Sequence, residues 1–186
     1  MSRSIKLSFY LTALLCMLAA PHLRAQEHPV KVEEQKSFNV VGLAVRTNNQ
    51  TEATGQGEIP KLWQRFVQQN VAASIPNRDG QSLIVVYTDY DSDQTGEYTY
   101  LIGARVTSTG DIPAGLTLKE VPAGSYAVLK SENGPVQEIL PKIWRQIWSM
   151  PPKDLGGQRA FKADYEVYPP DFDPQNVQVG LHIGLK

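Results

Sequence analysis

The feature that most constrains the fold of this chain is an internal repeat, in which matching residues are separated by 81 positions. Three separate matches share this offset: Pro60–Trp63 with Pro141–Trp144, Val86-Tyr87 with Val167-Tyr168, and Ile102-Gly103 with Ile183-Gly184. Two looser matches have an offset of 82: Gly42 with Gly124, and Asp89–Asp91 with Asp171–Asp173. Three matches at one offset indicate that the domain contains two copies of one structural unit.

Both halves, residues 38–110 and 111–186, show the same order of strand and helix patterns. The first half has strand patterns at Phe38–Thr47, Leu83–Tyr90 and Glu97–Thr107, and a helical stripe of Ile59, Leu62, Trp63, Phe66 and Val67. The second half has strand patterns at Leu116–Lys130 (interrupted by Pro122–Gly124), Ala163–Tyr168 and Val177–Leu185, and a helical stripe of Ile139, Leu140, Ile143, Trp144, Ile147 and Trp148. Apolar residues spaced by three and four positions line one face of an amphipathic helix.

These patterns predict an α+β fold made of two βαββ halves related by a pseudo-twofold axis. Joining the halves through their sheets gives one antiparallel sheet with both helices on one side. We expect a ligand groove between the halves, along the axis, on the other side. The tryptophan Trp63 is more typical of a core than of a ligand platform. Trp144 and Trp148 lie one turn apart, and one of them is a candidate for the groove.

The N-terminus has the layout of a secretory signal peptide. Arg3 and Lys6 precede the apolar run Leu7–Ala20, whose 14 residues are fewer than the ~20 that span a bilayer. A permanent membrane anchor is therefore disfavoured. We expect residues 1–25 to be removed after Ala25, which leaves a linker at 26–37 and one domain at 38–186. The predicted location is periplasmic or secreted.

The expected mature chain is mildly acidic and poor in metal ligands. Residues 1–25 contain three basic residues and no acid, so the net charge becomes 15 − 19 = −4. Binding to nucleic acid needs a basic surface, and this charge does not favour it. The only cysteine, Cys16, lies in the signal peptide, and His28 and His182 are the remaining histidines. A zinc site of nitrogen and sulfur ligands is excluded, and we expect no metal or cofactor.

The strand at residues 160–168 places a carboxylate in the middle of an apolar pattern. Because side chains alternate along a strand, Tyr165 and Val167 share one face while Glu166 and Tyr168 share the other. If Tyr165 packs in the core, Glu166 either faces solvent or lines a pocket. The residue pattern alone favours the solvated face, since an unpaired acid is seldom buried.

Several motifs resemble those of the GyrI-like, or AraC-type, effector-binding domains. The motifs are Val121–Val128 (VPAGSYAV), Gly134–Val136 followed by Leu140–Trp144, Tyr165–Tyr168 (YEVY), and the closing strand Val177–Leu185. The resemblance covers Phe38–Lys186, although Tyr165 stands where phenylalanine is usual and an export signal is atypical. It implies a duplicated βαββ fold with halves of SH2-like type, and a pocket between the halves that binds amphipathic, often cationic, small molecules.

The resemblance also implies that Glu166 lies in this pocket. Its repeat partner is Val85, so the pocket would contain one acid. A carboxylate among aromatic walls favours a bound organic cation, because the cation relieves its desolvation and stacks on the rings. The candidate walls are Tyr168, Tyr126, Trp144 and Tyr87, with Glu97 and Tyr98 as weaker candidates.

We therefore expect an exported domain that binds a small amphipathic molecule, with an aromatic cation favoured as the ligand. Two alternatives stay open. Glu166 could direct a water as general base in a hydrolase of electrophilic small molecules, or the groove could bind a protein partner. No serine stands in a nucleophile turn, and we assign no catalytic residue.

Overall fold

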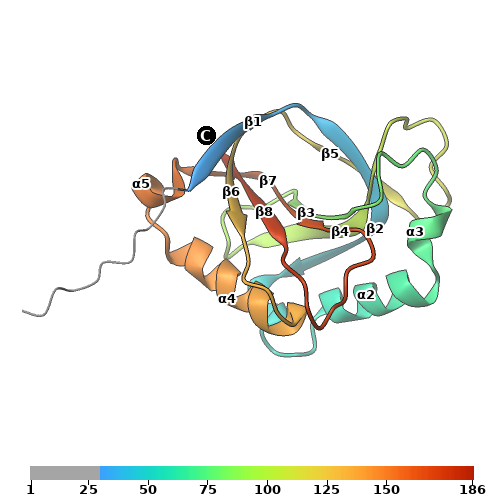
Figure 1. The fold of residues 1–186 in the computed structure, drawn as a ribbon, viewed down its shortest axis with the longest axis horizontal. Coiled ribbons are helices and arrows are strands. Elements are labelled where there is room, and N and C mark those ends of the chain that lie inside the picture. The colour runs from blue at the N-terminus through green and yellow to red at the C-terminus, as the bar shows by residue number, and fades with distance from the viewer. Residues whose placement is uncertain (1–29) are drawn as a thin grey trace, which may run out of the picture.

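In the computed structural model, which describes residues 30–186, one antiparallel sheet carries the two longer helices on one face (Figure 1). The strands are β1 (Lys31–Gln35), β2 (Phe38–Asn48), β3 (Leu83–Thr88), β4 (Glu97–Val106), β5 (Thr117–Val121), β6 (Gly124–Lys130), β7 (Arg159–Tyr168) and β8 (Gly180–Leu185). The helices are α1 (Asn49–Glu52), α2 (Glu58–Gln68), α3 (Val71–Ser74), α4 (Val136–Ser149) and α5 (Pro152–Leu155). The predicted signal peptide, residues 1–25, lies outside the described residues.

The strand order confirms the duplication. Across the sheet the order is β1-β6-β8-β7-β3-β4-β2-β5, so β6-β8-β7 in one half mirrors β2-β4-β3 in the other. The halves meet where β3 and β7 pair antiparallel, with Val85 opposite Glu166. Because 85 + 81 = 166, these paired residues are also repeat partners, and the pseudo-twofold axis passes between them.

The outer strands are exchanged between the halves. Strand β1 precedes the first half but pairs with β6, and β5 belongs to the second half but pairs with β2. In Figure 1, β1 and β5 lie above the central strands, on the side away from α2 and α4. Residues 26–37 were expected to be a linker, and this is corrected, because Lys31–Gln35 forms a strand of the sheet.

Glycines at repeat positions let neighbouring strands approach closely as the sheet curls. A Cβ atom on Gly103 of β4 would lie 2.0 Å from the carbonyl oxygen of Val41. Its repeat partner Gly184 of β8 is similar, since a Cβ there would lie 2.6 Å from the carbonyl oxygen of Ala163. Any larger residue would push the two backbones apart at these positions.

The face of the sheet without helices is a packed core, and not the groove that the sequence predicted there. Phe38 packs edge-on against Tyr165 with 5.3 Å between ring centroids, and Tyr126 packs on Tyr165 at 5.5 Å. The curled outer strands close this side of the sheet. The buried residues of this second core are Phe38, Val40, Ile84, Val86, Leu101, Val121, Tyr126, Ala163 and Tyr165.

The helix-covered face contains the larger core. The predicted amphipathic stripes are confirmed in part, since α2 buries Leu62 and Phe66 while α4 buries Ile139, Ile143, Trp144 and Ile147. Two residues of the predicted stripes are exposed instead, Val67 of α2 (69%) and Trp148 of α4 (39%). Glu52 of α1 fixes the start of α2 by accepting hydrogen bonds from the backbone N–H groups of Glu58 (2.9 Å) and Ile59 (3.3 Å). Within residues 30–186, the helices are too short or too polar to cross a membrane.

Candidate functional site

Glu166 lies in the helix-covered core, with its side chain 0% exposed. Strand β7 directs Asp164, Glu166 and Tyr168 to the same face, and α4 covers that face. The interpretation of Glu166 as a residue on a solvated face is therefore wrong. Alternation correctly grouped these side chains, but it did not show which face the helices cover.

Three neutral groups donate hydrogen bonds to the Glu166 carboxylate. The indole Nε1 of Trp144 (2.7 Å) and the hydroxyl of Tyr87 (2.8 Å) donate to Oε1. The hydroxyl of Tyr168 donates to Oε2 at 2.8 Å. These donors come from α4, β3 and β7, so three elements converge on one acid. Among residues 30–186, no lysine, arginine or histidine forms an ion pair with Glu166.

The buried setting shifts the proton equilibria of this cluster. Burial raises the pKa of Glu166, while the hydrogen bonds from Trp144, Tyr87 and Tyr168 oppose that shift. Burial and the nearby Glu166 charge raise the pKa of both Tyr87 and Tyr168 well above the ordinary value. The two phenols therefore stay neutral donors, and the site carries at most one negative charge.

Asp164, two residues earlier on the same face, shows the contrasting arrangement. It is also 0% exposed, but its Oδ2 accepts from the Arg159 guanidinium at 2.6 Å and from the Tyr90 hydroxyl at 2.7 Å. The guanidinium lies 4.3 Å from the ring centroid of Phe161. A register shift between Arg159 and Asp164, with Phe161 at φ 52°, brings the two charges together. Of these two acids, Asp164 has a cation beside it and Glu166 does not.

Aromatic rings surround Glu166 on several sides. The Tyr87 ring lies 4.9 Å from Trp144 and 5.1 Å from Tyr100, measured between centroids. On the other side, Trp63 lies 5.4 Å from Tyr168. Tyr87 and Trp63 are partly exposed, whereas the Glu166 carboxylate is not. A ligand therefore reaches the carboxylate only after a covering ring has moved.

The structure brings together four of the five predicted ligand-binding residues. Tyr87, Trp144 and Tyr168 contact Glu166 directly. Tyr126 is the exception, because it lies in the second core and donates its hydroxyl to the carbonyl oxygen of Pro122 at 2.8 Å. The expected place of Tyr126 beside Glu166 is corrected.

Sequence reasoning missed two aromatic residues of the cluster. Tyr100 accepts a hydrogen bond from the Trp63 indole at 2.7 Å, and Phe172 packs on Tyr168 at 5.0 Å. Alternation along β4 could have indicated Tyr100, since it shares a face with the weaker candidate Tyr98. Phe172 follows β7 in a loop, where no periodic pattern applies.

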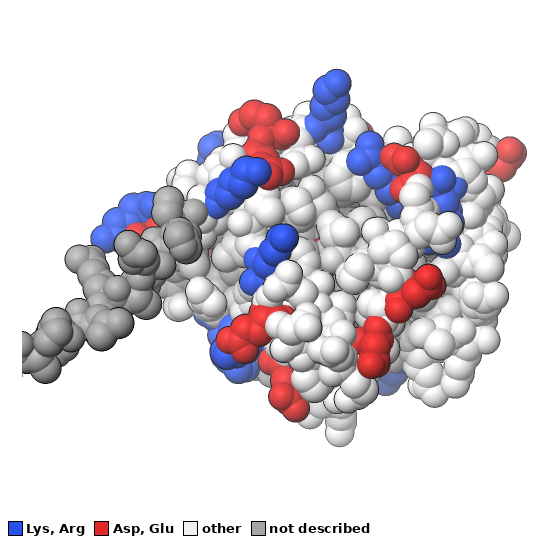
Figure 2. Space-filling model, viewed as in Figure 1, with Lys and Arg blue, Asp and Glu red and all other residues white. Residues whose placement is uncertain are grey.

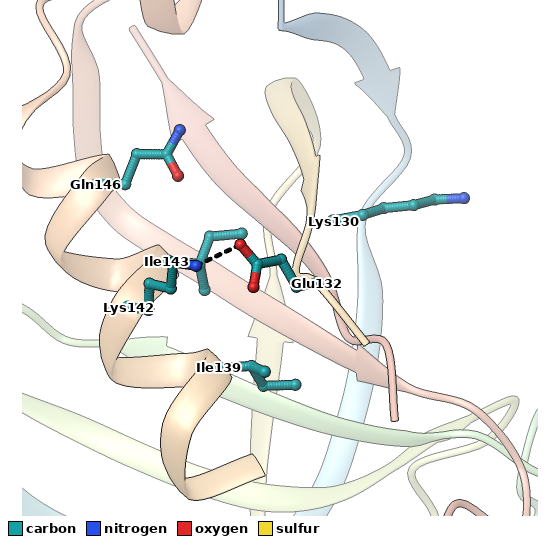
Figure 3. Close-up of a pocket in the computed structure, with 6 residues that line it drawn as sticks. All are labelled: Lys130, Glu132, Ile139, Lys142, Ile143 and Gln146. Carbon is teal, nitrogen blue, oxygen red and sulfur yellow. Dashed lines mark hydrogen bonds and ion pairs between the residues drawn. The ribbon is translucent and has the colours of Figure 1, made fainter. Parts of the chain in front are cut away.

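A surface hollow beside α4 differs from this cluster. It is lined by Lys130, Glu132, Ile139, Lys142, Ile143 and Gln146 (Figure 3). Lys142 forms an ion pair with Glu132, so the acid of this hollow has a counter-charge. Its lining contains no aromatic ring. On the face of the domain drawn in Figure 2, basic and acidic side chains are interspersed among the described residues.

The duplicated fold, with its two halves joined through β3 and β7, is that of a GyrI-like effector-binding domain. The chain belongs to the family of integron-associated effector-binding proteins, Cass2, which its residues 31–185 match. The resemblance noted in the sequence is thereby confirmed.

Two relatives are described as transcriptional regulators. YobU of Bacillus subtilis (strain 168) is 31% identical over 147 residues, which cover 78% of this chain and 90% of YobU. BrlR of Pseudomonas aeruginosa is 27% identical over 168 residues, which cover 88% of this chain but only 58% of BrlR.

Two solved structures share the fold. The integron cassette protein VCH_CASS2 of Vibrio cholerae has a TM-score of 0.67 at 23% identity, with 85% of this chain and 96% of that chain covered. SAV2435, solved bound to tetraphenylphosphonium, has a TM-score of 0.69 at 18% identity, with 86% and 94% covered. At these identities the two structures establish the fold alone.

Proposed function

We propose that this domain binds an amphipathic organic cation and pairs its positive charge with Glu166. The observation that carries the proposal is a fully buried carboxylate whose hydrogen-bond partners are all neutral. Burying an ionised carboxylate without a counter-charge is costly, and neutral hydrogen bonds offset that cost only in part. A ligand cation supplies the missing charge.

The aromatic rings around Glu166 suit the same ligand. A cation held against an aromatic face gains roughly 0.5–2 kcal/mol for each contact, and the gain is largest where water is excluded. The neighbouring Asp164 supports this reasoning, because the chain there combines an acid, a guanidinium and the Phe161 ring. At Glu166 the acid and the rings are present, and the ligand provides the cation.

The ligand of SAV2435 guides the choice of probe. Tetraphenylphosphonium is a lipophilic cation with four aromatic rings, and SAV2435 shares the fold of this chain. The low identity transfers no residue role from SAV2435, so the role of Glu166 rests on the contacts described above. From the sequence, hydrolysis and partner binding remain as alternatives, and no contact within residues 30–186 favours either.

The proposal is tested with two probes of the same shape and opposite charge. Tetraphenylphosphonium and tetraphenylborate are titrated into the protein that begins at Gln26, and binding is followed by calorimetry and by tryptophan fluorescence. We expect the cation to bind and to change the fluorescence, because Trp144 must leave Glu166. Equal binding of the anion, or no binding of any aromatic cation in a wider panel, would contradict the proposal.

We also infer that the chain is exported. The inference rests on the charged start and the apolar run Leu7–Ala20, which lie outside the described residues. N-terminal sequencing of the protein from a periplasmic extract should give Gln26 or a residue close to it. Soluble cytoplasmic protein that retains Met1 would contradict export.

A further inference from the structure

Tyr100 of β4 has a buried hydroxyl that accepts a hydrogen bond and donates none to the described residues. The side chain is 2% exposed, and its oxygen accepts a hydrogen bond from Nε1 of Trp63 at 2.7 Å. Among residues 30–186, no oxygen accepts the hydroxyl proton of Tyr100 in return. Burial raises the pKa of Tyr100 well above its ordinary value, so the proton stays on the oxygen. Buried polar groups normally find partners, and this donor lacks one.

The other tyrosines on this face use their protons. Tyr87 and Tyr168 donate to Glu166, Tyr90 donates to Asp164, and Tyr98 donates to Oδ1 of Asn49 at 2.9 Å. Tyr100 is therefore the one phenol of this set whose O–H has no acceptor among the described residues. The set consists of Tyr87, Tyr90, Tyr98, Tyr100 and Tyr168.

The repeat relates Tyr100 to the Glu166 site through the two helix tryptophans. Trp63 and Trp144 are repeat partners, since 63 + 81 = 144. Each donates its indole N–H to an oxygen of the sheet, Trp63 to the Tyr100 hydroxyl and Trp144 to Glu166. The equivalent indole hydrogen bond thus ends on a neutral oxygen beneath α2 and on a carboxylate oxygen beneath α4.

The two oxygens lie close enough for one small molecule to reach both. Strand β3 lies between β4 and β7, and Tyr87 of β3 is opposite Tyr100 on one side. On its other side Tyr87 pairs with Asp164, and Glu166 lies two residues farther along β7. Two inter-strand spacings and this two-residue stagger together separate the backbones of Tyr100 and Glu166 by about 12 Å. The Tyr87 ring bridges them, because it packs edge-on against Tyr100 and donates to Glu166.

We propose that Tyr100 forms a second, neutral subsite, whose hydroxyl donates a hydrogen bond to an acceptor on the same ligand whose cation pairs with Glu166. This inference rests on the proposed function and narrows the ligand class. The preferred ligands are organic cations that carry a carbonyl, ether or similar acceptor several ångströms from the positive centre. Tetraphenylphosphonium, which has no such acceptor, occupies only the charged part of the site.

Matched pairs of cations test this subsite. One member of each pair is an (acetylphenyl)triphenylphosphonium ion, as its ortho, meta or para isomer, and the other has an isopropenyl group in which C=CH₂ replaces C=O. We expect the wild type to bind at least one acetyl isomer roughly two- to tenfold more tightly than its hydrocarbon partner. Tyr100→Phe should abolish that preference, so that the acetyl and isopropenyl cations of each pair bind the variant equally well.

Tyr126→Phe is the matched control, because it removes a buried phenol on the opposite face of the sheet. This variant should keep the preference for the acetyl cation. If the wild type shows no preference for any isomer, or if Tyr100→Phe retains the preference, the subsite is overturned while the pairing with Glu166 stands. If no cation of either kind binds, the proposed function fails and the subsite fails with it. The comparison of cation pairs on the wild type needs no variant, so a Tyr100→Phe protein that does not fold leaves the test intact.

Discussion

Replacing Glu166 by glutamine removes the charge of the site and keeps its shape. In the wild type, Oε1 accepts hydrogen bonds from Trp144 and Tyr87, and Oε2 accepts from Tyr168. A glutamine can direct its amide oxygen to the first two donors and its NH₂ group to Tyr168, whose hydroxyl then accepts instead of donating. The hydrogen bonds of the folded protein are conserved in number, and the costly buried charge is gone. We therefore expect the melting temperature at neutral pH to stay the same or to rise slightly.

The same change should weaken binding of a cation. A charge-assisted contact in a desolvated site contributes roughly 1.5–3 kcal/mol, so the affinity of Glu166→Gln for tetraphenylphosphonium should fall about tenfold to a hundredfold. Calorimetric titrations of wild type and variant measure this difference. Glu132→Gln is the control, because Glu132 is an exposed acid in the hollow beside α4 and should not affect affinity. If Glu166→Gln binds every aromatic cation as tightly as the wild type, the assignment of Glu166 is refuted.

Three further changes test the surrounding structure. Burial raises the pKa of folded Glu166, so the protonated carboxyl stabilises the fold at low pH, and this contribution is lost as the pH rises through the folded pKa. The advantage in melting temperature of Glu166→Gln over the wild type should therefore shrink on acidification. The affinity of the wild type for cations should fall over the same pH range. Arg159→Met leaves Asp164 buried without its counter-charge and should lower the free energy of unfolding by about 3–5 kcal/mol in urea titrations, whereas an unchanged midpoint would show that the pair is dispensable. Gly103→Ala places a Cβ 2.0 Å from the carbonyl oxygen of Val41 and should cost about 1–3 kcal/mol or more in the same assay.

The sequence predicted the fold because duplication and alternation can both be recognised from the spacing of residues along the chain. The offset of 81 residues identified the two halves and pairs Trp63 with Trp144. In the structure each of these tryptophans donates its indole N–H to an oxygen of the sheet. Alternation correctly placed Glu166 and Tyr168 on one face of β7. These signals depend only on spacing along the chain, so they can be recognised without knowledge of the tertiary structure.

The sequence could not show which face of the sheet the helices cover. Both faces are buried here, because the exchanged strands β1 and β5 close the side that the helices leave free. Tyr126 was placed beside Glu166 for this reason, although it packs in the second core. Strand β1 (KVEEQ) was missed because it is an edge strand with mainly exposed, charged residues, which resemble a linker.

The site arises from the differences between the two halves rather than from their similarity. At the axis, the position occupied by Glu166 in one half is occupied by Val85 in the other, directly across the β3–β7 pair. Two glutamates there would place two carboxylates in one closed core, and their repulsion would hold one of them protonated. A single acid leaves one negative charge, which suits a monovalent cation. The phenol of Tyr100 is a difference of the same kind, since its repeat partner is Leu181, at 100 + 81. The two halves share the aromatic pairs Trp63/Trp144 and Tyr87/Tyr168, whereas Glu166 and Tyr100 each occur in one half only. The proposed ligand, with a cation at one end and an acceptor at the other, depends on these two differences.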